Sequence, residues 1–219
     1  MNAAPLAATP RVLHLDAACV VVDKPAGLLS VPGRGPDKQD CLARRVQALW
    51  PEAQVVHRLD MGTSGVWLMA RGPDMQRAFS RAFEQQAVDK HYVAVVAGRV
   101  VPPQTVDGWG VIDLPLAADW PRRPLQKIDP VQGRPSLTRW RVEQTEADRT
   151  RLALAPRTGR THQLRVHLQA IGHPILGDAL YAPPQVQAMA PRLLLHACAL
   201  RLTHPLSGEA LELRCDPPF

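Results

Sequence analysis

The chain has 219 residues and a mass of 24.1 kDa, which is enough for one large domain with a buried core. Hydrophobic residues make up 46% and charged residues 21%, which excludes a disordered chain, and the longest apolar run, around Cys19–Val22, is too short to cross a membrane. Residues 1–10 have no basic start and no long apolar stretch, so we expect no signal peptide, no membrane partner and a cytoplasmic location.

The charge of the chain points to an anionic partner. Lys and Arg number 26 against 20 Asp and Glu, which gives a net charge of +6 and an isoelectric point near 9.6. Only four of these cations are lysines, and arginine offers both a planar fork for phosphate and a flat face for stacking on bases. A chain this basic is a candidate nucleic-acid binder, although GC-rich codon usage would enrich arginine as well. Composition alone leaves both explanations open.

The cysteines and histidines do not have the spacing of metal ligands. The four cysteines are widely separated and form no C-x-x-C pair, which argues against a zinc knuckle or a thioredoxin-type redox pair. His162 and His167 are five residues apart, one more than the spacing that places two ligands on one helical face. We therefore expect no metal site.

The first half of the sequence alternates short strands with two helices. A tight turn at 16–18 follows the first strand, and a Gly- and Pro-rich loop occupies 25–36. Asp40 is expected to cap the first helix, and Pro73, at a first helical position, opens the second. In chain order, we expect strands at 11–15 and 19–23, a helix at 41–50, a short apolar segment at 54–56, a strand at 65–70, a helix at 73–86 and a strand at 90–97.

The second half contains an irregular stretch rich in Pro and Trp at 102–135, which we expect to be pinned by buried aromatic side chains; its role stays open. After it we expect strands at 137–142 and 152–155, a helix at 161–171 that ends at Gly172, and a hairpin of strands at 193–202 and 210–213. Strands outnumber helices, and paired strands are close in sequence. This predicts an α+β fold, a single domain on a mostly antiparallel mixed sheet at 11–219, preceded by a flexible N-terminus at 1–10.

Two polar segments interrupt the apolar pattern and are the candidate functional sites. His57–Gly65 lies between two apolar strands, where rigid elements can position catalytic side chains. Arg157–His167 holds three arginines and two histidines beside an expected helix start. Backbone N–H groups at that start, together with Arg157 and Arg160, suit an anion such as phosphate. An ordinary turn and a solvated basic helix end are the alternative interpretations of the two segments.

Two hydrolytic chemistries fit these segments poorly. Gly62–Gly65 lacks the G-x-S-x-G spacing of a nucleophile elbow, so a hydrolase using Ser64 and His162 is disfavoured. A glycosidase needs two carboxylates across one bond, and Asp60 has only Asp178 as a plausible distant partner.

Six segments, in order, resemble motifs of the RluA family of pseudouridine synthases. His57–Gly65 is similar to the family's H-R-L-D-x-x-T-S-G signature, with Gly62 where Ala is common. The others are Val22–Leu28 (V-x-K-P-x-G-L), Lys90–Val96 (K-x-Y-x-A-x-V), Thr158–Arg165 (T-G-R-x-H-Q-L-R), Gly172–Asp178 and Leu194–Ala197. The matches cover most of the chain, and they imply an RNA pseudouridine synthase.

The resemblance also implies residue roles. The reaction breaks the N-glycosidic bond of a uridine, turns the uracil and rejoins it through C5, without a cofactor. Asp60 would act at the sugar, either as a nucleophile or as a base toward a glycal intermediate, with Arg165 as its cationic partner. Tyr92 would stack on the uracil and accept the C5 proton, and Leu164 would form the other wall of the pocket. Arg58 would fill the space of the flipped base. His57 lies in the same RNA-contacting loop and would support that loop.

The resemblance extends to the branch of the family that modifies both tRNA and 23S rRNA. Ser30–Arg34, Asp113–Leu116, Asp119–Pro121 and Arg123–Pro124 match features of that branch, and about ten residues before Arg11 are too few for an S4 RNA-binding domain. The expected substrates are uridine 32 in the tRNA anticodon stem-loop and uridine 746 in a 23S rRNA hairpin, bound by a monomer. The alternatives are a single RNA class, rRNA only, or a non-catalytic RNA-binding module.

Overall fold

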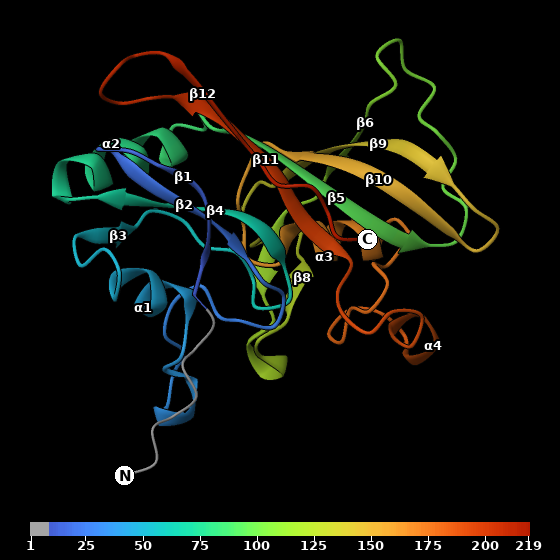
Figure 1. The fold of residues 1–219 in the computed structure, drawn as a ribbon. Helices are drawn as coiled ribbons and strands as arrows, with labels where there is room; N and C mark the ends of the chain where they lie inside the picture. The colour runs from blue at the N-terminus through green and yellow to red at the C-terminus, as the bar shows by residue number, and fades with distance from the viewer. Residues whose placement is uncertain (1–8) are drawn as a thin grey trace. The chain divides into compact units, whose positions relative to one another are not determined.

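The structure, a computed structural model, describes residues 9–219 and contains two compact units (Figure 1). Unit 1 consists of the described residues up to Val88 together with Arg201–Cys215, and unit 2 consists of Asp89–Leu200 with Asp216–Phe219. Strand β11 (Leu195–Thr203) belongs to both, because the boundary falls after Leu200. The expectation of a flexible segment at 1–10 lies almost wholly outside the described residues.

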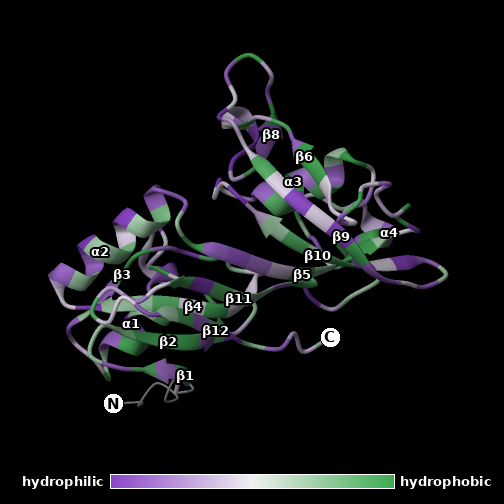
Figure 2. Cartoon of the chain, turned by 90° about the horizontal axis from the view of Figure 1, so that it is seen from above, coloured by the Kyte–Doolittle hydropathy of each residue, from purple (hydrophilic) through white to green (hydrophobic). Residues whose placement is uncertain are grey.

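Unit 1 is a small antiparallel sheet with two helices. The order is β1-β2-β4, with β3 also on β4, and β12 pairs with β11. Seven of the eight residues of β4 are buried, and β2 and β4 are mostly hydrophobic (Figure 2), as expected for strands covered on both faces. Its elements are β1 (Arg11–Leu15), β2 (Cys19–Lys24), η1 (Pro36–Lys38), α1 (Leu42–Gln47), β3 (Ala53–Val55), β4 (Ser64–Arg71), α2 (Pro73–Glu84) and β12 (Ala210–Arg214).

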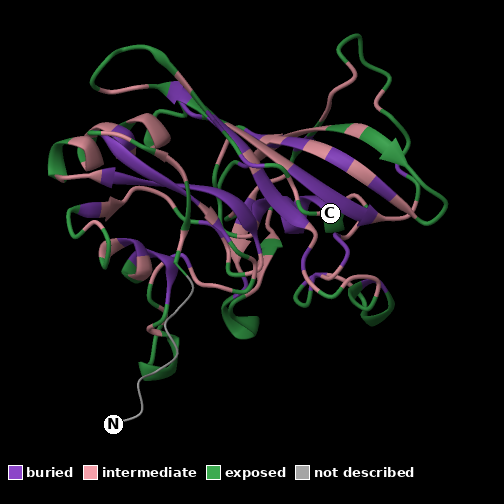
Figure 3. Ribbon diagram, viewed as in Figure 1, coloured by how far each residue is buried: buried purple, intermediate pink, exposed green. Residues whose placement is uncertain are grey.

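Unit 2 is built on a sheet in the order β11-β5-β10-β9-β6 and a separate two-stranded sheet, β7-β8. Every second residue of β10 is buried (Figure 3), and Leu152 and Leu154 pack in one cluster with Leu164 and Leu168 of α3. The elements are β5 (Asp89–Ala97), β6 (Gly110–Asp113), β7 (Leu116–Ala118), η2 (Trp120–Arg122), β8 (Gln126–Ile128), β9 (Leu137–Thr145), β10 (Arg149–Pro156), α3 (Gln163–Ala170) and α4 (Pro184–Gln187).

Most elements expected from the sequence are present. The strand at 11–15 has the expected bounds, and the other expected strands differ by up to three residues at an end. The pairs β1-β2, β2-β4, β3-β4, β5-β10, β9-β10, β6-β9 and β7-β8 are antiparallel. The predicted mostly antiparallel α+β fold is therefore confirmed. Within the described part of the chain, no helix is long and apolar enough to cross a membrane.

Two local predictions were wrong. Asp40 does not cap the first helix: Cys41 is the N-cap residue, and the Asp40 carboxylate accepts hydrogen bonds of 2.9 and 2.6 Å from Arg45. The Pro- and Trp-rich stretch is not pinned by buried aromatics, since Trp120 is 66% exposed. It is anchored instead by β6, which pairs with β9, and by the buried Leu116 of the β7-β8 sheet.

Candidate active site

The polar segment that contains Asp60 lies in unit 1, between β3 and β4. Its side chains alternate in exposure: Arg58 is exposed, Leu59 is buried and Asp60 is half-buried. The loop turns at Asp60, whose carbonyl accepts a hydrogen bond from the Thr63 amide at 3.1 Å. The turn leads directly into β4. Gly65, the second residue of that strand, has a φ of 113°, a conformation that favours glycine.

A buried lysine holds this loop from beneath. Lys24 ends β2, its exposed fraction is 0%, and its ammonium donates three hydrogen bonds to backbone carbonyls. The acceptors are the oxygens of Pro25 at 3.0 Å, Met61 at 3.1 Å and Thr63 at 2.7 Å. An ammonium has three N–H donors, so all of them are used. Lys24 thereby fixes the chain on both sides of Gly62, immediately after Asp60.

Two further contacts fix the segment before Asp60. Ser30 Oγ donates to the Leu59 carbonyl at 2.7 Å. The Leu59 amide in turn donates to Ser30 Oγ at 3.1 Å. The Leu68 amide donates to Nε2 of His57 at 3.1 Å, while the His57 ring stacks on Phe83 at a centroid distance of 4.6 Å. Nε2 of His57 is therefore an acceptor toward the backbone. This geometry is that of a support for the loop.

Arg58 is the exposed cation of this loop. Among the described residues it forms no ion pair with a carboxylate. Its neighbour Leu59 is anchored in the core, so the backbone at Arg58 is fixed while the guanidinium faces solvent. An exposed guanidinium on a fixed backbone suits contact with an RNA base or phosphate.

Tyr92 and Leu164 lie together in unit 2. Tyr92 is in β5, opposite Leu154 of β10, and it packs against the hydrophobic cluster that includes Leu164 of α3. Tyr92 is half-buried and Leu164 is 7% exposed. Both side chains therefore belong to one hydrophobic cluster of unit 2.

Arg165 is buried next to Leu164 and is held by a carboxylate of its own unit. Its Nε and Nη2 donate to the two oxygens of Asp178 at 2.8 and 2.6 Å, a bidentate pair with side-chain exposures of 7% and 1%. Asp178 also accepts from the amides of Leu180 and Tyr181, at 2.9 and 3.1 Å. The guanidinium lies 5.0 Å from the Tyr181 ring centroid. The orientation of Arg165 is thus fixed by the carboxylate of Asp178. The sequence did not predict this pairing.

A chain of hydrogen bonds fixes the start and the buried face of α3. The Gln163 side chain accepts from Thr158 Oγ1 at 2.7 Å and from the Arg160 amide at 3.0 Å. Its amide nitrogen lies 3.0 Å from Thr138 Oγ1, which lies 2.9 Å from Nδ1 of His167. Nε2 of His167 lies 2.9 Å from the Leu114 carbonyl, an oxygen that only accepts, so Nε2 carries the proton and Nδ1 accepts from Thr138.

Burial lowers the pKa of His167, and the hydrogen bond to Leu114 only partly opposes this. The imidazole is therefore the neutral form, and both of its nitrogens are occupied by protein groups. His167 acts as a structural residue of α3.

The basic residues at the start of α3 have different surroundings. Arg157 is exposed and forms an ion pair of 3.2 Å with Asp89, while Arg160 is exposed and donates from Nε to the Pro135 carbonyl at 3.4 Å. Lys90 donates to the Thr158 carbonyl at 3.2 Å, and its pKa is lowered by burial and by the neighbouring Arg157. The helix begins at Gln163, two residues later than expected, because His162 has a left-handed φ of 55°.

One cluster of possible metal-ligand side chains lies outside these segments, in unit 1. The ligand atoms of His14, Asp16 and Cys19 lie within 4.8 Å of one another. Asp16 Oδ1 accepts from the Ala18 and Cys19 amides at 2.7 and 2.8 Å, and Oδ2 lies 2.6 Å from His14 and 3.2 Å from His204. Burial and the nearby Asp16 raise the pKa of the Cys19 thiol to about 12, which disfavours the thiolate. The arrangement is that of a capped turn between β1 and β2.

The contacts of this cap lower the pKa of Asp16. Burial by itself raises the pKa of Asp16, but the hydrogen bonds from His14 and from the Cys19 and Ala18 amides outweigh it and lower the pKa to about 2. Sequence reasoning missed this cluster, as it missed the roles of Lys24 and Asp178. For the last two the signal was present, because both lie inside recognised motifs, but their partners are distant in sequence.

A mostly antiparallel α+β chain that carries a fixed H-R-L-D loop and, on other elements, the ordered K-x-Y and T-G-R-x-H-Q-L-R motifs is a pseudouridine synthase, an isomerase that acts on RNA. The chain belongs to the RNA pseudouridylate synthase family, whose model matches residues 18–170 and so includes parts of both units.

Proteins similar in sequence include the "Dual-specificity RNA pseudouridine synthase RluA" of Escherichia coli K12, which is 47% identical over 95% of this chain and 93% of its own length. The protein of the same name from Yersinia pestis is 46% identical over 95% of this chain and 99% of its own length. Among solved structures, human RNA pseudouridylate synthase domain containing 1 matches with a TM-score of 0.77 and 28% identity, over 96% of this chain and 84% of that one.

Proposed function

We propose that this enzyme isomerises uridines in two RNA classes, uridine 32 in the tRNA anticodon loop and uridine 746 in 23S rRNA. The likeness to RluA proteins named for dual specificity supports this, since it extends over 95% of the chain and 93% of the relative. The alternative is the same chemistry on rRNA only. We also propose that the enzyme is a monomer that binds these hairpins without a further protein, in the cytoplasm.

The observation that carries the catalytic proposal is Asp60 on a backbone fixed by Lys24 and Ser30. We propose that its carboxylate acts at the ribose of the target uridine, as nucleophile or as base, while the bond from C1′ to N1 breaks. A fixed backbone supports this role because positioning of the reacting group is a large part of catalysis. The uracil then rejoins C1′ through C5.

The other roles follow the family resemblance and the environments described above. Tyr92 stacks on the uracil and relays the C5 proton to solvent while N1 gains a proton, so that the product is an isomer of the substrate. Leu164 packs on the base from α3. Arg165, whose orientation Asp178 fixes, supplies the cation for the reacting carboxylate.

The RNA-contacting roles belong to Arg58, Arg157 and Arg160. Arg58 stacks in the space of the flipped base, for which an exposed guanidinium on a fixed backbone is suited. Arg157 and Arg160 contact phosphates near the start of α3. His57 contributes through the loop, as a support held by Leu68 and Phe83.

Tritium release from hairpins labelled at uridine C5 tests the proposal. Wild-type enzyme is expected to release tritium from an anticodon-arm hairpin and from a 23S rRNA hairpin. Asp60→Asn is expected to reduce release by roughly a thousandfold or more while RNA affinity changes little, because affinity rests mainly on contacts of Arg and Lys with phosphate.

Asp74→Asn is the matched control, because Asp74 is an exposed carboxylate of the same unit, on α2. It is expected to act like wild type. Activity of Asp60→Asn within tenfold of wild type would refute the role of Asp60. Reaction of only one hairpin would refute dual specificity and leave the isomerase activity intact.

A further inference from the structure

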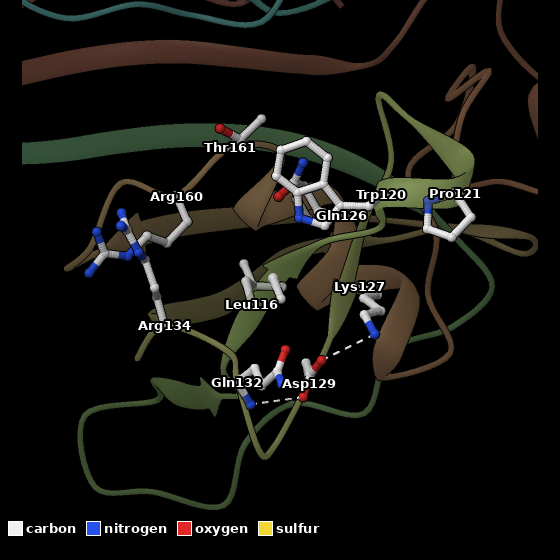
Figure 4. Close-up of a pocket in the computed structure, with 12 residues that line it drawn as sticks. Leu116, Trp120, Pro121, Gln126, Lys127, Asp129, Gln132, Arg134, Arg160 and Thr161 are labelled. Carbon is white, nitrogen blue, oxygen red and sulfur yellow. Dashed lines mark hydrogen bonds and ion pairs between the residues drawn. The ribbon is translucent and has the colours of Figure 1, made fainter.

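A pocket in unit 2 lies beside the β7-β8 sheet (Figure 4). Its volume is about 520 Å³, within the range of about 300–1,000 Å³ that is usual for small-ligand sites. Its walls come from β7 and β8, from Arg134, and from Arg160–Thr161 at the start of the α3 motif. The lining includes the side chains of Leu116, Trp120, Gln126, Lys127, Arg134 and Arg160.

The pocket has an excess of positive charge. Lys127 forms an ion pair of 3.1 Å with Asp129, the one carboxylate of the lining. Arg134 and Arg160 are exposed, and within residues 9–219 neither forms an ion pair. Backbone hydrogen bonds of 2.8 and 3.0 Å between Arg134 and Leu116 fix the first of these arginines. Two guanidiniums without a carboxylate partner are suited to one phosphate group.

The same pocket presents an exposed aromatic surface. Trp120 is 66% exposed, and the Arg123 guanidinium lies 3.2 Å from its ring centroid. Arg123 covers one face of the indole, and such flat exposed rings serve as stacking platforms for unpaired bases. In Figure 4 the two guanidiniums lie together to the left of Leu116, and the indole lies above it. The pocket therefore combines a stacking surface with an anion site, the two features that a nucleotide requires.

This pocket is connected to Arg165 by fixed hydrogen bonds. The Gln126 amide donates to Tyr181 Oη at 2.8 Å, and that oxygen lies 2.6 Å from Nδ1 of His162. The Tyr181 amide donates to Asp178, which holds Arg165. The wall of the pocket and the buried arginine of α3 therefore share one support, so a ligand in the pocket has a defined position relative to Arg165.

We propose that this pocket binds one unpaired nucleotide of the substrate RNA other than the target uridine, with its base stacked on Trp120 and its phosphate between Arg134 and Arg160. The inference rests on the proposed function, because the ligand is part of the same hairpin. It gives the Pro- and Trp-rich stretch a role in substrate recognition.

The test measures the Kd of both hairpins for Trp120→Ala, Trp120→Phe, Arg134→Ala and Arg160→Ala. Arg99→Ala is the control, because Arg99 is an exposed arginine of the same unit outside the lining. Trp120→Ala is expected to raise Kd by about 5- to 150-fold on at least one hairpin, the range for loss of one stacked base, and Trp120→Phe by less. Arg134→Ala and Arg160→Ala are each expected to reduce the salt dependence of binding by about 0.7 in log–log slope relative to Arg99→Ala.

The position of the bound nucleotide is found by replacing each loop nucleotide in turn with an abasic residue. Wild-type enzyme is expected to bind a hairpin that is abasic at one particular non-target position much more weakly than the intact hairpin. Trp120→Ala is expected to bind this abasic hairpin and the intact one with similar affinity. Such non-additive losses show that Trp120 and the missing base are in contact. Additive losses at every position, or a Trp120→Ala hairpin Kd equal to that of Arg99→Ala, would overturn the proposal.

Tritium release by wild type is measured on the same hairpins. Release without any effect of Trp120→Ala would refute the pocket and leave the proposed function standing. Absence of release from either hairpin would refute the proposed function itself.

Discussion

Lys24→Met tests whether the buried ammonium positions the Asp60 loop. Methionine keeps much of the length of lysine but donates no hydrogen bond, so the carbonyls of Pro25 and Thr63 lose their partner, while the Met61 carbonyl keeps the Gly27 amide at 2.8 Å. The Thr63 contact is buried, whereas those of Pro25 and Met61 are partly buried, where water can replace the ammonium in part. A hydrogen bond to a charged group contributes about 1.5–3 kcal/mol, and an unsatisfied buried group costs about 1–3 kcal/mol.

With the full cost of about 2 kcal/mol at Thr63 and about half of it at Pro25, Lys24→Met is expected to lower the free energy of unfolding by about 3 kcal/mol. For a chain of 219 residues, each kcal/mol lowers Tm by about 2–4 °C, so the expected loss is about 6–12 °C. Turnover measured well below that Tm is expected to fall at least about tenfold, because a shift of the Asp60 backbone misplaces the reacting carboxylate.

The measurements are a thermal unfolding curve and single-turnover tritium release. Lys38→Met is the control, since Lys38 is an exposed lysine in η1 of the same unit. Lys24→Arg, which keeps the charge in a site that is 0% exposed, is expected to be intermediate in both measurements. A Tm and a turnover of Lys24→Met equal to those of Lys38→Met would refute the clamp.

Three further outcomes are expected. Arg58→Ala lowers turnover on a hairpin with a stacked target uridine more than on one whose uridine is already unstacked, since the flipping cost of a few kcal/mol is then smaller; equal losses would contradict the stacking role. Asp16→Asn destabilises the protein at pH 7 by up to about 2 kcal/mol. Because the folded pKa of Asp16, about 2, lies below the ordinary 3.8, the difference in stability between wild type and variant is full above pH 3.8 and disappears as the pH falls through 2. Unfolding curves of both proteins at pH 7 and near pH 2 measure it. Dialysis against EDTA leaves tritium release from a prefolded hairpin unchanged, and a loss restored by one specific metal ion would refute the expectation that the reaction needs no metal.

Local patterns predicted the elements whose burial follows from their own sequence. The strand at 11–15 and the buried run of β4 were found because alternation or continuous apolarity marks them directly. The start of α3 was misplaced by two residues, because the Gln163 side chain binds the Arg160 amide and His162 adopts a left-handed conformation. Strands β7 and β8 have three residues each, too few to show any period.

The candidate site could be predicted only where a motif carried it. Asp60, Tyr92 and Arg165 were named from the resemblance, and geometry then added their supports: Lys24 beneath the loop and Asp178 behind Arg165. A lysine at the end of a strand is ordinarily expected at the surface, because its charge is costly to bury. That cost is offset here by three carbonyls, two of which are 37 and 39 residues away, and no local pattern reports such contacts.

The pocket beside β7-β8 bears on whether one enzyme accepts two RNA classes. A site that stacks a base on Trp120 and holds its phosphate has no required hydrogen bond to the base edge, and stacking tolerates every base. Two hairpins of different sequence would then satisfy it equally, provided that each places an unpaired nucleotide at the same distance from the target. Dual specificity therefore predicts that Trp120→Ala weakens both hairpins by similar factors. A loss confined to one hairpin would mean that the pocket selects between the RNA classes instead of serving both.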